Sequence, residues 1–159
     1  MKNFSKKLLA LLLVVVSIFA LAGCGNGDKL TGEVTIVLVG ETEVVYKIDL
    51  EEGGFSEGDT GYNALVYLNE KEGVEFSATT SFVSNGFDAF VNSIGDLNPV
   101  YGSTQYVALF HNVEAKKDVS QWALEDRVFD GTTLYYSGVG VGGLKLKDGL
   151  VICFVIESY

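Results

Sequence analysis

The feature that most limits what this chain can fold into is an uncharged apolar run over residues 8–22. Lys2, Lys6 and Lys7 precede the run, and no acidic residue stands before it. A membrane span takes about 20 residues, so a run of fifteen fits an export signal better than a span. The pattern predicts a leader over residues 1–23, which leaves enough chain for one domain with a modest core.

The run ends in Leu21-Ala22-Gly23-Cys24, which resembles the bacterial lipobox. The resemblance implies that a diacylglycerol alkylates the Cys24 thiol and that the leader is cut just before it. Two acyl chains hold a protein on a membrane where one would not. The alternative is an uncleaved anchor helix, and in both cases the domain faces the extracellular or envelope side of the cell membrane. Residues 24–32 then form the lipidated cysteine and a polar, Gly-rich tether.

The composition after the leader favours a folded, β-rich and strongly acidic domain. Hydrophobic residues make up 48% of the chain and there is one proline, which excludes a disordered tail. Beyond the leader stand eight basic and 21 acidic residues, a net charge of −13. Such a surface repels nucleic acid, so we expect no nucleic-acid partner, and solubility is the simplest role of the charge.

Apolar patterning predicts two strands over residues 34–39 and 44–50, and then a helix. Thr60 or Asp59 is expected to cap this helix, which runs to about Glu72 and stops at Gly73.

The pattern continues as a hairpin and further strands. A half-buried strand from Val74 to Phe82 turns at Asn85-Gly86 into a strand over residues 87–94. Later strands are predicted over residues 105–110, 134–137 and 150–156, and residues 119–124 suit one or two helical turns. This order predicts an α+β domain over residues 33–159, with an antiparallel or mixed sheet and one packed helix.

Four stretches make the chain similar to the DUF4430 group, the transcobalamin-like C-terminal domain family. They are the helix start at residues 60–65, the strand and turn at residues 90–97, the aromatic strand at residues 106–112 and the ending at residues 138–149. The resemblance covers roughly residues 35–158 and implies a β-grasp (ubiquitin-like) fold. It also implies cobalamin as a ligand. Family members with known ligands bind cobalamin between this domain and a large helical domain.

Aromatic residues outside regular alternation are the candidate binding surface. Trp122, Phe129, Tyr135 and Tyr136 fall within fifteen residues. We expect Trp122, Tyr135 and Tyr136 to gather at one end of the sheet with His111 nearby, where they would stack on a flat ligand or contact a partner. The alternative is that these rings plug the end of the sheet as core.

Other reactive residues have simpler alternatives. His111 is either an axial ligand to a corrinoid or haem metal, or an ordinary surface or loop histidine. Gly138, Gly140 and Gly143 match G-x-G-x-x-G, but no helix follows, so tight turns are expected. Asp130-Gly131 is expected to be solvated rather than bound to calcium, and Cys153 to be a buried small hydrophobe.

The leading hypothesis is a non-enzymatic, surface-tethered binding module for a cobalamin-like or other small ligand. The alternative is a protein-interaction or scaffold module of an envelope complex without a small ligand. An enzyme ranks third, because polar residues do not cluster at catalytic spacing and no metal site is expected.

Replacing Cys24 with Ser should abolish lipidation, because an alcohol at this position does not form the thioether. Labelling growing cells with radioactive palmitate tests this, since the label should enter the wild-type chain and not the Cys24→Ser variant. A Cys24→Ser variant that still carries label and is processed normally would contradict the lipobox assignment.

Overall fold

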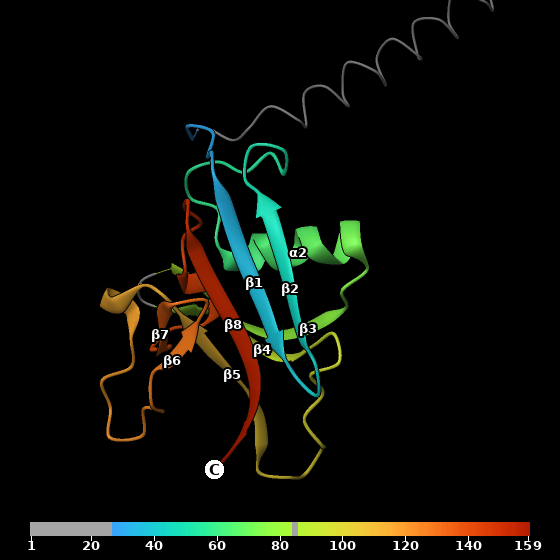
Figure 1. Cartoon of the computed structure of the whole chain (residues 1–159), viewed down its shortest axis with the longest axis vertical. Helices are drawn as coiled ribbons and strands as arrows, with labels where there is room; N and C mark the ends of the chain where they lie inside the picture. Colours follow the sequence, from blue (N-terminus) through green and yellow to red (C-terminus); the bar gives the residue numbers. More distant parts are fainter. Residues whose placement is uncertain (1–26, 84–85) are drawn as a thin grey trace, which may run out of the picture.

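The computed structural model describes residues 27–83 and 86–159. The predicted leader, Cys24 and Asn85 of the predicted turn lie outside these residues. The strands and the helix are as follows (Figure 1): β1 (Glu33–Val39), β2 (Glu43–Asp49), α2 (Gly61–Glu72), β3 (Phe76–Val83), β4 (Gly86–Ile94), β5 (Gln105–His111), β6 (Arg127–Phe129), β7 (Thr132–Tyr136) and β8 (Leu150–Ser158). Two single 3-10 turns, η1 (Glu114–Lys116) and η2 (Val141–Gly143), lie in the connections.

Six strands form one curled, mixed sheet in the order β2-β1-β8-β5-β7-β6. The central pair, β1 and β8, is parallel, with Ile36 opposite Ile152, and the other pairs are antiparallel. Over residues 27–83 and 86–159, the predicted α+β class with a mixed sheet and one α-helix is confirmed. Within the described ranges, no helix is long and apolar enough to span a membrane.

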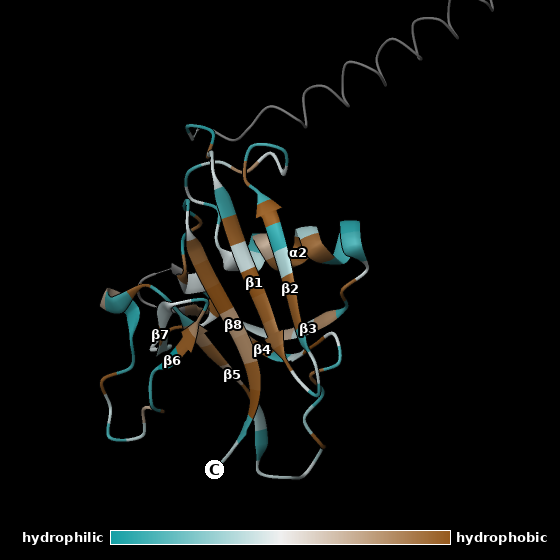
Figure 2. Ribbon diagram, in the orientation of Figure 1, coloured by the Kyte–Doolittle hydropathy of each residue, from teal (hydrophilic) through white to brown (hydrophobic). Residues whose placement is uncertain are grey.

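The central strands are buried on both faces, which explains their continuous apolar runs. On one face Ile36, Ile152 and Phe154 pack with Leu65 of α2 in the larger core cluster. On the other face Val37, Cys153 and Phe110 form a smaller cluster under residues from β7 and the preceding segment. Figure 2 shows β8 as hydrophobic along most of its length.

Helix α2 begins and ends where the sequence predicts. The backbone N–H of Thr60 donates to Asn63 Oδ1 at 2.9 Å, which fixes the first turn. Gly73 ends the helix in the left-handed region at φ 68°, and its N–H bonds to the carbonyl of Asn69. Ala64, Leu65 and Leu68 form the buried side that covers the sheet.

The β3–β4 hairpin is present as predicted, but it forms a separate two-stranded sheet instead of joining the main one. The register of the pair shifts between Ser77 and Ala78, where β4 carries one extra residue, Asn92. Phe82, expected on the buried side of its strand, is 90% exposed, and its ring lies 6.0 Å from the ring of Phe87.

Strand β6 is absent from the sequence prediction, and the expected helical turns at residues 119–124 are wrong. Asp130 and Gly131 both have positive φ, 45° and 75°, and join β6 to β7 as a two-residue hairpin turn. Asp-Gly is a strong hairpin signal, because both residues tolerate the positive φ that a two-residue turn requires. Residues 119–124 form an irregular connection with a turn at Gln121 and Trp122.

A buried carboxylate attaches the β3–β4 hairpin to the rest of the domain. Asp88 of β4 accepts backbone N–H bonds from Gly140 at 2.8 Å, from Gly143 at 3.0 Å and from Ala89 at 2.8 Å. A Cβ at Gly142 would come within 2.9 Å of the backbone of Asp88 and Ala89. The glycines thus let the connection between β7 and β8 approach β4 closely enough to hydrogen-bond the carboxylate.

Asp88→Ala should lower the free energy of unfolding by about 2–4 kcal/mol, because it leaves amide donors without acceptors at a buried site. Urea denaturation followed by circular dichroism measures this change.

Asp49→Ala is the matched control for this prediction. Asp49 also accepts two backbone N–H bonds, from Glu51 and Glu52, but at an exposed site where water can replace it. Its loss should cost about 1 kcal/mol or less. Equal costs at the two sites would contradict the role assigned to Asp88.

Candidate functional site

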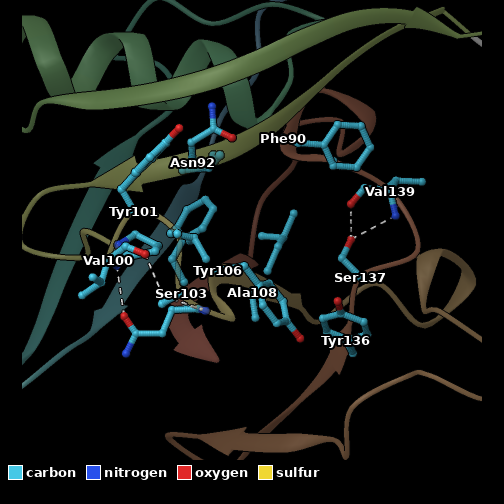
Figure 3. A pocket seen from close by; sticks show the side chains of 18 residues that line it. Phe90, Asn92, Val100, Tyr101, Ser103, Tyr106, Ala108, Tyr136, Ser137 and Val139 are labelled. Carbon is cyan, nitrogen blue, oxygen red and sulfur yellow. Dashed lines mark hydrogen bonds between the residues drawn. The ribbon is translucent and has the colours of Figure 1, made fainter. Parts of the chain in front are cut away.

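An open groove of about 520 Å³ lies between β4, β5 and the connection that follows β7 (Figure 3). Phe90 and Asn92 of β4 lie on one side, Tyr106 and Ala108 of β5 form the floor, and Tyr136 lies opposite. We call it the β5-edge groove.

The loop that closes one end of the groove is held by its own hydrogen bonds. Val100 N–H donates to Gln105 Oε1 at 3.1 Å, and Ser103 Oγ donates to the carbonyl of Val100 at 2.7 Å. These bonds leave the side chain of Tyr101 in solvent beside the groove. The groove therefore has an ordered wall as well as an exposed ring for a ligand to contact.

The groove runs along a stretch of β5 edge that no described strand pairs with. Strand β7 pairs with β5 only at Phe110 and His111, and Ser137 N–H then bonds to the carbonyl of Leu109 at 2.9 Å. Backbone groups of alternate residues point to the same edge of a strand, so the N–H and C=O of Val107 point toward the groove. The groove therefore offers one backbone donor and one backbone acceptor between aromatic rings.

The two predicted tyrosines lie on opposite faces of the sheet. Tyr136 is opposite Phe110, and the two rings lie 5.5 Å apart. Tyr135 is opposite His111, and its ring lies under the ammonium of Lys117 at 5.5 Å. Because successive residues of a strand point to opposite faces, only Tyr136 reaches the β5-edge groove. Burial, followed by the neighbouring hydroxyl of Tyr106, raises the pKa of Tyr136 to about 12, so the phenol stays neutral.

His111 is fully buried, which contradicts its reading as a surface histidine. Its Nδ1 accepts the N–H of Val113 at 3.1 Å, and Nε2 has no hydrogen-bond partner among the described residues. Burial lowers the pKa of His111, the positive charge of Lys116 lowers it further, and the backbone of Lys116 acts in the opposite direction. The ring is thus a neutral imidazole in the core, closed to a ligand metal in this conformation.

Trp122 is 78% exposed in the connection between η1 and β6. The close ring pairs among the described residues do not include it. The structure thus brings His111 together with Tyr135 and places Tyr136 in the groove. A joint surface of all four residues stays a prediction.

The residues that sequence reasoning missed are Phe90, Asn92 and Tyr106. Phe90 and Asn92 are on β4, which was predicted as a strand without an assigned exposed side, and Phe90 is 52% exposed. Local sequence carries no signal for these residues, because the exposed side of β4 depends on which neighbours cover the hairpin.

The remaining reactive residues are structural. Burial raises the pKa of the Cys153 thiol to about 11, as expected for a small core side chain. The glycine pattern at residues 138–143 directs its amides at Asp88, which leaves two of them occupied. Across residues 27–83 and 86–159, no group of three or more His, Cys, Asp or Glu side chains is arranged to hold a metal ion.

No family model and no curated protein sequence matches this chain. Among solved structures, haptocorrin in complex with Cbi is similar over 87% of this chain and 28% of its own, with 12% identity and a TM-score of 0.53. This chain thus spans little more than a quarter of haptocorrin. A Ruminococcus gnavus ATCC 29149 protein provisionally described as metal-binding aligns over 80% of this chain and 98% of its own, with 11% identity and a TM-score of 0.49. The likeness to haptocorrin is one of fold, and the DUF4430 assignment stays a prediction.

The free energy of unfolding should fall as the pH drops below about 6.5. In this range the unfolded chain binds a proton at His111, whereas the folded chain, in which the pKa of His111 is lowered, does not. The lowered pKa means that the folded imidazole stays neutral in this range, so the stabilisation is present above pH 6.5 and lost below it. Thermal unfolding between pH 7.5 and pH 5 measures the slope.

His111→Phe should flatten this slope, and carboxyl groups contribute in both proteins and so cancel in the comparison. The single imidazole resonance of the wild type reports the pKa directly by NMR. A midpoint at or above 6.5 would contradict the assignment.

Proposed function

We propose that this chain is a lipid-anchored, non-enzymatic binding module whose ligand site is the β5-edge groove. The observation that carries the proposal is the combination of aromatic rings with an unpaired strand edge in one open groove. Rings bind the flat face of a ligand, and the donor and acceptor of Val107 suit amide groups at its rim.

The ligand class that fits this groove best is a corrinoid. Corrinoids are flat macrocycles with amide side chains, and haptocorrin, which shares the fold, was crystallised with Cbi. The groove is smaller than a whole corrinoid, so this domain would cover one side of the ligand. A second protein or a neighbouring domain would then cover the other side.

The proposal includes a β-grasp fold of the DUF4430 group and a lipid anchor at Cys24. The order β2-β1-β8-β5 with a parallel central pair supports a β-grasp fold and membership of the DUF4430 group. The leader ending at Cys24 supports attachment to the cell membrane. An enzymatic role is disfavoured because His111 is buried away from the groove.

A partner-protein module without a small ligand is the second candidate. Val119 and Trp122 are 83% and 78% exposed in one irregular connection, which is the kind of apolar surface that partners cover. A module of this kind would ignore corrinoids, so the same titration separates the two functions.

The test is a titration of the purified full chain in nonionic detergent with dicyanocobinamide. Binding should raise the melting temperature in proportion to the logarithm of ligand concentration. Phe90→Ala should weaken binding by roughly threefold to tenfold through the lost ring contact.

Phe82→Ala is the matched control, since Phe82 lies on the same hairpin but outside the groove. No response to dicyanocobinamide, or an equal loss in both variants, would rule out the groove as a corrinoid site.

A further inference from the structure

A second cavity of this acidic domain is lined by several lysine side chains. It measures about 580 Å³ and lies beside η1, η2 and the segment before α2. Three lysines line it: Lys116 after β5, and Lys145 and Lys147 before β8. It shares only Val139 with the β5-edge groove, and we call it the lysine pocket.

The three lysines are not neutralised by ion pairs within the described part of the chain. The ion pairs there are Lys47–Glu33, Lys117–Glu114 and Arg127–Glu157. Of the eight basic side chains in this part, five remain, and three of those five face one cavity. In a chain with 21 acidic residues, such a concentration of unpaired cations makes the cavity locally positive.

The acidic neighbours of the pocket are already engaged. Asp88 reaches the lining, but its carboxylate is buried and held by three amide donors. Asp148 accepts the N–H of Glu33, and Asp59 accepts the N–H of Ser56. None of these carboxylates forms an ion pair with a lysine of the pocket, so among the described residues the three ammonium groups have no direct anionic partner.

Backbone geometry directs the lysines to one side. Lys145 and Lys147 are exposed while Leu146 between them is buried, as expected when alternate residues of extended chain point the same way. The backbone bridge between Thr60 and Lys145, and the bond from Leu146 N–H to the carbonyl of Asp59, fix this segment against the start of α2.

The rest of the wall is apolar. Phe87, Val113, Val139 and Leu144 line the cavity, and Phe87 is held by edge-on contact with the ring of Tyr62 at 5.3 Å. A ligand that fits both parts carries a compact negative charge at one end and an apolar body at the other.

We propose that the lysine pocket binds a small phosphate monoester with an apolar substituent. A phosphate monoester carries a charge of about −2 above its second pKa near 6. Three ammonium groups therefore attract it more strongly than they attract a carboxylate, which carries a single negative charge. The lysines bind the phosphate group in this proposal, because the backbone amides of Gly140 and Gly143 already donate hydrogen bonds to Asp88. The site is independent of the corrinoid proposal.

The test is isothermal titration calorimetry of the full chain in nonionic detergent with phenyl phosphate. Phenyl phosphate should bind at least about tenfold more tightly than inorganic phosphate because of its apolar ring. Benzyl alcohol should show no binding. Added salt should weaken the binding of phenyl phosphate, since the contacts are between exposed charges.

The double variant Lys145→Gln, Lys147→Gln should weaken phenyl phosphate binding at least about tenfold through loss of two nearby charges. Lys71→Gln is the matched control, because Lys71 is also exposed and without an ion pair among the described residues but lies on α2 outside the pocket. Phe90→Ala, in the other groove, should leave this binding unchanged.

Absence of heat with phenyl phosphate, or an equal loss in Lys71→Gln, would overturn the proposal. Tighter binding of benzoate than of phenyl phosphate would also overturn it, since the site would then select a carboxylate.

Discussion

The carboxylate of Asp88 is the interaction on which the arrangement of this domain depends. The β3–β4 hairpin makes no ladder with the main sheet, so its position has to come from side chains and from loop backbone. The carboxylate of Asp88 accepts hydrogen bonds from backbone amides of a loop more than fifty residues later in the chain, and these bonds hold β4 against η2. Both cavities depend on this contact, because β4 supplies a wall to each of them. Satisfying a buried carboxylate with several amide donors makes the position of the hairpin specific as well as stable.

The β5-edge groove exists because β7 is short and pairs with β5 over only two residues. Ser137, which follows β7, makes the last bond to this edge at Leu109, and the chain after Ser137 leaves the edge of β5 uncovered toward Val107. The rest of the edge is shielded by the rings of Tyr106, Tyr136 and Phe90 rather than by another strand. Proteins usually cover or charge such an edge to prevent aggregation. Covering it with rings that leave a groove keeps the edge available to a ligand.

Most of the fold could be predicted from local signals, and apart from the missed hairpin at Asp130-Gly131 and the turns expected at residues 119–124, the errors were at tertiary contacts. Alternation, the cap at Thr60 and the stop at Gly73 located the helix and the main strands, since each depends on residues close together in sequence. The separate hairpin sheet could not be predicted, because the bonds of Asp88 join residues far apart. In the candidate site, the alternation of side chains along a strand determines which tyrosine lines the groove. Tyr135 and Tyr136 are adjacent in sequence but point to opposite faces, and the exposed side of β4 could not be recognised without its neighbours. The burial of His111 likewise depends on packing that one strand does not reveal.

The parallel pairing of β1 with β8 has a consequence for the order in which the domain folds. The first and the last of the described strands are neighbours at the centre of the sheet, so the core closes only when residues 150–155 reach residues 34–39. Until then β1 has a partner on one side only, and β5 lacks the strand beside which it lies. Contacts of such long sequence separation form slowly. The centre of the sheet is therefore among the last parts of the domain to form, and the earlier strands stay without their central partner until β8 is in place.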